Sequence, residues 1–147
     1  MTSFDAVYTA FLSKILDDEW EDWSEEELAD DLFTLLQGAI VRFKFPRVSL
    51  EFEYNEGTPI GFADTLTNEE IQILATYMKC EWLNRTILTW ENVKPLYEER
   101  DFSQANLLDK FNAMLAAEQQ HAAQLEAIYY RSINKKPFLY RQLAEQG

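Results

Sequence analysis

Two side chains that often carry catalysis occur once each in this 147-residue chain, Cys80 and His121. A Cys–His pair makes a thiolate nucleophile when a third residue orients the imidazole. Nothing in the surrounding sequence orients either side chain, and we expect them on different helices. Cys80 lies among apolar residues, so we interpret it as a small buried hydrophobe and predict no nucleophilic site.

Glu118 and His121 have the E-x-x-H spacing with which one helix supplies two ligands to a di-iron site. Such a site needs a second pair of this kind, and the chain has no second histidine. We therefore interpret the pair as a surface glutamate beside a half-buried imidazole. No metal and no cofactor are expected.

The remaining motifs also argue against an enzyme. The sequence has no C-x-x-C pair and no glycine-rich phosphate loop. The runs Glu25-Glu26-Glu27 and Asp30-Asp31 lack the glycine turn and spaced ligands of a calcium loop. A helix start and a solvated face explain these acids.

The overall charge excludes several classes of partner. Asp and Glu number 26 and Lys and Arg 13, a formal net charge of −13. Such a chain repels phosphate backbones and anionic membranes. No apolar run reaches the ~20 residues of a membrane span, and Met1 to Leu16 does not have the pattern of a secretory signal. We expect a soluble protein of the cytoplasm, or of a particle assembled there.

Helical periodicity dominates the chain, and four Gly and four Pro give few turn signals. Ser24 with Glu27, and Thr67 with Glu70, form capping boxes that mark helix starts. Helices are expected at about residues 3–16, 24–43, 67–82, 85–97 and 103–131. The prediction is a mostly α protein: one helical bundle over residues 1–131 with a long final helix, then a C-terminal arm over 132–147.

One segment, near residues 47–60, departs from this pattern. Apolar side chains alternate there with polar ones, and Asn55-Glu56-Gly57 ends the run. We read a short strand or hairpin, or an extended loop, without an obvious partner strand in the chain. A neighbouring subunit is the hypothetical contact for Val48, Leu50, Phe52 and Tyr54.

Charge is unevenly distributed along the chain. Residues 1–31 contain eleven acids and one base, whereas residues 127–147 contain four bases and one acid. Complementary ends can attract between copies. The predicted acidic face, toward another subunit or a channel lumen, comprises Asp17, Asp18, Glu19, Glu21, Asp22, Glu25 and Glu26. The predicted docking arm comprises Lys135, Lys136, Phe138, Leu139, Tyr140 and Arg141.

A family resemblance lies in the second half of the chain. It begins with Thr67-Asn68-Glu69-Glu70-Ile71-Gln72-Ile73-Leu74-Ala75, followed by Met78 and Glu81-Trp82-Leu83. Glu91-Asn92, Phe102-Ser103-Gln104-Ala105-Asn106 and Leu108 continue it. Over residues 65–131 this pattern resembles the head–tail connector (adaptor, or head-completion) proteins of tailed bacteriophages.

The resemblance implies an α-helical virion protein of the phage neck, assembled in the host cytoplasm. Such proteins form a ring, usually a dodecamer, beneath the portal protein, receive the tail or stopper protein and extend the DNA channel. DNA would pass through without specific binding, because an acidic lumen repels it. The C-terminal arm would dock on the portal.

Other functions remain open at this point. Another neck or tail component is possible, although tail terminators and stoppers tend to be β-rich. A small acidic regulator that binds a basic protein would use the acidic cluster and leave the basic tail unexplained. A metal-dependent helical enzyme would need more than one histidine.

Overall fold

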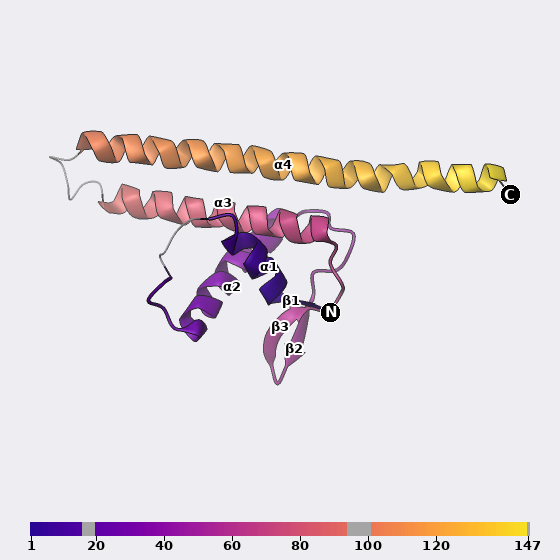
Figure 1. The fold of residues 1–147 in the computed structure, drawn as a ribbon, viewed down its shortest axis with the longest axis horizontal. Coiled ribbons are helices and arrows are strands. Elements are labelled where there is room, and N and C mark those ends of the chain that lie inside the picture. Colours follow the sequence, from indigo (N-terminus) through magenta and orange to yellow (C-terminus); the bar gives the residue numbers. More distant parts are fainter. Residues whose placement is uncertain (16–19, 94–100, 147) are drawn as a thin grey trace.

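The computed structural model describes the backbone of residues 1–15, 20–93 and 101–146 and the side chains of residues 1–15, 20–92 and 106–131. In chain order the elements are β1 (Thr2–Ser3), α1 (Phe4–Leu12), α2 (Glu25–Arg42), β2 (Phe52–Asn55), β3 (Thr58–Phe62), α3 (Asn68–Val93) and α4 (Asp101–Gln146). The protein is mostly helical, with a long C-terminal helix, as the sequence predicts (Figure 1).

Helix α3 lies at the centre of the fold. It packs against α1, α2 and α4, with α4 on one side and α1 and α2 on the other (Figure 1). Its buried side chains include Ile73, Leu74 and Met78 on one stretch and Leu83 one turn later. A helix that is apolar on more than one face is expected to lie between layers, and this one does.

The predicted capping residues begin the helices. The Oγ of Ser24 accepts a hydrogen bond from the Glu27 amide at 3.1 Å. At α3 the exchange is reciprocal: the Glu70 amide donates to Thr67 Oγ1 at 3.2 Å, and the Thr67 amide donates to Glu70 Oε1 at 2.7 Å. Each bond satisfies an amide that the first helical turn leaves without a partner.

Two predicted helix boundaries are wrong. The stretches expected at 67–82 and 85–97 are one continuous helix, α3, through Val93. Pro95, expected to bend or end the second stretch, lies outside the described residues.

The final helix does not end near Arg131 but runs through Pro137 to Gln146. Proline removes one backbone hydrogen bond, and helix-favouring residues around it let a long helix continue at that cost. The predicted arm is therefore the end of α4.

The period-two segment forms a hairpin within the chain. Strands β2 and β3 pair antiparallel, β1 adds to the other edge of β3, and the order is β1-β3-β2. Glu56 and Gly57 have φ of 52° and 82°, the left-handed values of a two-residue type I′ turn. Of the conformations that the sequence left open, the hairpin is the one observed, and β3 is the partner strand that was not obvious from the sequence.

An aromatic cluster joins this small sheet to the helices. The Phe4 ring lies 5.1 Å from Phe52, 5.3 Å from Phe62 and 5.5 Å from Phe33, centroid to centroid. These rings come from α1, both hairpin strands and α2. The contacts of Phe4 with Phe52 and Phe62 are edge-to-face, and such contacts contribute about 0.5–1.5 kcal/mol each beyond simple burial. The hairpin is thereby attached to the body rather than free.

A buried carboxylate joins α3 to α4. Glu70 is fully buried, and the Tyr129 hydroxyl donates to its Oε2 at 2.7 Å. The same hydroxyl accepts from the Arg47 amide at 2.7 Å, and the Arg47 guanidinium lies 4.8 Å from the centre of the Tyr129 ring. A buried carboxylate is tolerated only when its oxygens are hydrogen-bonded, so this network constrains three parts of the chain at once.

We expect Tyr129→Phe to lower the free energy of unfolding by about 1–3 kcal/mol, because it leaves a buried carboxylate oxygen and a backbone amide with one partner fewer. Urea denaturation followed by circular dichroism measures the loss. The control is Tyr130→Phe, which removes a hydroxyl that donates to Glu126 from a half-buried position. Equal losses in the two variants would contradict a special role for the Glu70 network.

Alkaline pH should weaken the same network. Burial, and then the hydrogen bond to Glu70, raises the pKa of Tyr129 to about 12 from an ordinary value of 10.0. The folded state therefore favours the neutral phenol, and its contribution is complete below pH 10 and is lost as the pH rises from 10 to 12. The stability difference between the wild type and Tyr129→Phe should shrink over that interval. A constant difference would contradict the assignment.

Candidate protein–protein interfaces

The structure places the residues considered for catalysis in different environments. His121 is exposed on α4, not half-buried as predicted. Glu118 instead forms an ion pair with Lys79 of α3 at 2.9 Å. Among the residues that the structure describes, no group of three or more His, Cys, Asp or Glu side chains is placed to hold a metal ion.

Cys80 is fully buried in α3, as the sequence indicates. Burial raises the pKa of its thiol to about 11, so the thiolate is scarce at neutral pH. The side chain acts in packing.

The end of α4 extends beyond the other described elements of the fold (Figure 1). Figure 1 shows this helix continuing well past the first turn of α3, with no other segment beside its end. We name residues 132–146 the overhang. They span about 22 Å at the helical rise of 1.5 Å per residue. The docking residues predicted here (Lys135, Lys136, Phe138, Leu139, Tyr140 and Arg141) lie on this overhang, and their side chains are outside the described set.

Two exposed apolar side chains, Phe45 and Ile128, and the half-buried Tyr130 lie near the point where the overhang begins. Phe45 is 71% exposed, and its ring lies 6.5 Å from that of half-buried Tyr130. Ile128 is 54% exposed. Positions 128 and 130 face opposite sides of a helix, since each residue advances it by about 100°. We name Phe45, Ile128 and Tyr130 the apolar collar. A partner bound along the overhang would contact this collar where the overhang joins the body.

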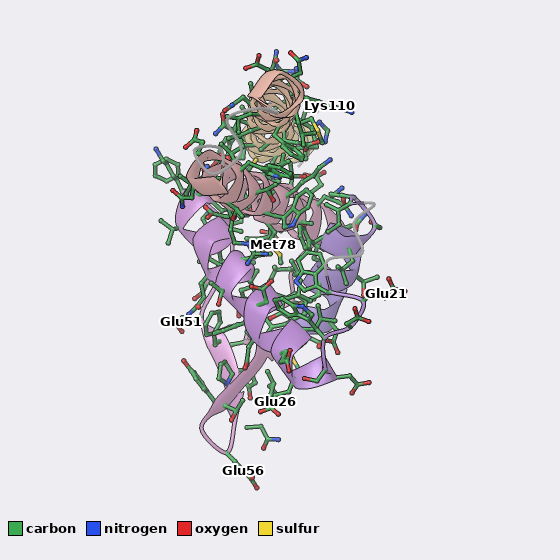
Figure 2. The ribbon with its side chains drawn as sticks, turned by 90° about the vertical axis from the view of Figure 1, so that its left-hand side faces the viewer. Glu21, Glu26, Glu51, Glu56, Met78 and Lys110 are labelled. Carbon is green, nitrogen blue, oxygen red and sulfur yellow. The ribbon has the colours of Figure 1, made fainter. Side chains whose placement is uncertain are left out.

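The predicted acidic face is only partly described. Glu21, Asp22, Glu25 and Glu26 are exposed at the start of α2, whereas Asp17, Asp18 and Glu19 lie outside the described residues. In Figure 2, Glu21 and Glu26 lie on the body, far from Lys110 on α4. Asp31, from the same acidic stretch, is turned inward and receives two hydrogen bonds from Arg85, at 2.5 and 3.0 Å.

Trp20 belongs to the core, although acidic residues surround it in the sequence. It is 7% exposed, its ring packs on Phe11, and its indole nitrogen donates to Asp31 at 2.7 Å. Trp23 remains 39% exposed. No helical periodicity marks one indole as buried and the other as surface, because the described residues 20–24 form turns rather than a helix.

The residues proposed to contact a neighbour through the hairpin divide into two groups. Val48, Leu50 and Phe52 are partly buried against the chain's own core. Tyr54 is 59% exposed near the hairpin tip, where Figure 2 shows Glu56 at the extremity. Contact with a neighbour stays a prediction, and Tyr54 is the member of the set most free to make it.

Comparison of the chain with protein-family models, with curated proteins and with solved structures finds no match. Among the described residues, no helix is both long and apolar enough to cross a membrane.

Proposed function

We propose that this protein is a ring-forming connector at the neck of a tailed-phage particle, and that it joins the portal to the tail or stopper. The observation that carries the proposal is the overhang of α4. Fifteen or so residues of regular helix extend from a body that leaves them uncovered (Figure 1). A protruding helix is a common element for insertion into a groove of another subunit.

The composition of the overhang supports a protein partner. Lys135, Lys136 and Arg141 carry positive charge in a chain whose net charge is −13, and Phe138, Leu139 and Tyr140 supply apolar and aromatic side chains. Aromatic residues and arginine are enriched at protein interfaces. The apolar collar at the base of the overhang extends this surface onto the body. The partner in the proposal is the portal protein.

The acidic start of α2 fits a position near DNA or near another copy. Exposed glutamates and aspartates repel a phosphate backbone, so DNA can slide past without being held. The proposal needs no catalytic group, and its mechanism is assembly: surface is buried between copies, and two different faces are then presented to the portal and the tail.

Truncation after Ser132 tests the docking role. The shortened chain retains Tyr129 and the collar, so it should keep the helical circular dichroism of the body. We expect it to lose co-purification with the portal protein encoded in the same genome. The triple variant Phe138→Ala, Leu139→Ala, Tyr140→Ala should lose most of that binding in a chain of full length.

Glu56→Ala, at the hairpin tip, serves as the surface control and should bind as the wild type does. Undiminished portal binding by the truncated chain would overturn the docking role of α4. The neighbouring genes provide an independent check, since a connector gene is expected among those for portal, capsid and tail. A location far from any such genes would count against the whole proposal.

A further inference from the structure

A groove lined by lysines and apolar residues lies where the residues that follow α1 meet α3 and α4. Its lining includes three lysines, Lys14, Lys79 and Lys110, which we call the rim, and apolar side chains that include Trp82, Phe111 and Met114, which we call the floor. Its volume is about 400 Å³, enough to admit an aromatic side chain. Three cations around one apolar groove are unusual in a chain in which acids outnumber bases two to one. We name this feature the lysine groove.

Among the residues that the structure describes, only one of the three lysines of the groove has a carboxylate partner. Lys79 is compensated by its ion pair with Glu118, and only 15% of its side chain is exposed. Lys14 donates to the amide oxygen of Gln72 at 2.8 Å, a neutral acceptor that leaves the charge in place. Lys110 is exposed and forms no ion pair with the side chains that the structure describes. An occupant with negative charge and an apolar group would complement this groove.

The same chain carries such a surface elsewhere. At the start of α2 the half-exposed indole of Trp23 is flanked by five exposed acids, Glu21, Asp22, Glu25, Glu26 and Glu27. We name residues 21–27 the acidic knob. In Figure 1 the start of α2 is at the far side of the body from α4, and in Figure 2 Glu21 and Glu26 are likewise far from Lys110. Within one molecule the acidic knob cannot fill the lysine groove.

We propose that the lysine groove of one copy receives the acidic knob of a second copy, with Trp23 over the apolar floor and the glutamates facing Lys14 and Lys110. The two surfaces differ, so the contact is head-to-tail, and repetition of such a contact closes a ring or continues as a filament. The inference deepens the proposed function by assigning the contact between neighbouring subunits. It depends on the proposed function only in the assumption that these head-to-tail contacts close into a ring.

Charge reversal on each side tests the pairing. Lys14→Glu with Lys110→Glu reverses the rim and leaves the Lys79–Glu118 ion pair intact, whereas Glu25→Lys with Glu26→Lys reverses the knob. Either double variant alone should lose about ten- to a hundredfold in self-association, since rim charges now repel. Mixing the two variants should restore association, because each groove then meets a complementary knob. Sedimentation velocity measures the loss of association in each variant and its restoration in the mixture. The experiment is done at low salt, because at 0.1 M the Debye length is only about 10 Å and exposed charge pairs are screened.

The matched control changes the charge by the same amount away from the groove. Lys44→Glu with Arg131→Glu alters two exposed cations and should associate as the wild type does, apart from a general effect of added negative charge. Equal weakening by this control and by the groove variant would overturn the pairing. So would mixed groove and knob variants that fail to associate.

Cross-linking tests the contact when self-association of the wild type is too weak to be detected by sedimentation velocity. A carbodiimide joins a lysine amine to a carboxylate only where the two touch, with loss of one water. In a sample mixed from ¹⁴N- and ¹⁵N-labelled chains, peptides linking Lys14 or Lys110 to residues 21–27 should carry one light and one heavy partner. The inference would be refuted if every cross-linked pair carried the same label on both peptides, or if no such cross-links formed at millimolar protein.

The two proposals fail separately. A chain truncated after Ser132 retains the lysine groove and the acidic knob, so it should still give mixed-label cross-links even though portal binding is lost. Lost cross-links with intact portal binding would refute the contact between copies alone. Intact cross-links in a chain that never binds a portal would refute the neck assignment alone.

Discussion

The buried carboxylate of Glu70 is the constraint on which the arrangement of this protein depends. One of its oxygens caps α3 by accepting from Thr67, and the other accepts from Tyr129 of α4. Tyr129 in turn binds the backbone of Arg47, beyond the end of α2. An unsatisfied carboxylate in this position would destabilise the fold by several kcal/mol, so the three segments are held together.

The position of this network explains why α4 protrudes. Glu70 lies in the first turn of α3, and α4 runs antiparallel to α3, so Tyr129 is opposite the point where α3 begins. Lys79 with Glu118 and Tyr77 with Glu126 connect the two helices in the same register. Once α4 has passed Tyr129 there is no further α3 to cover it (Figure 1). The overhang thus follows from register rather than from an absence of apolar residues.

Register and charge together explain how a small acidic protein could serve assembly. The overhang and apolar collar lie at one end of α4, the lysine groove lies beside its first half, and the acidic knob is across the body. Surfaces of different chemistry in different directions are what a subunit needs to meet a copy of itself and an unlike partner together. A single reactive centre is not needed for that.

Local sequence patterns correctly predict the helical class, the capping residues Ser24 and Thr67 and the buried thiol of Cys80. These signals act over a few residues, where backbone hydrogen bonding and helical periodicity decide the outcome. The tertiary structure alone decided that Trp20 is core while Trp23 is surface, that β3 pairs with β2, and that α4 continues past Pro137. It also brought Lys14, Lys79 and Lys110 to one groove and gave Glu70 its partner 59 positions away. Burial and electrostatic pairing depend on distance in space, and spacing along the chain does not encode that distance.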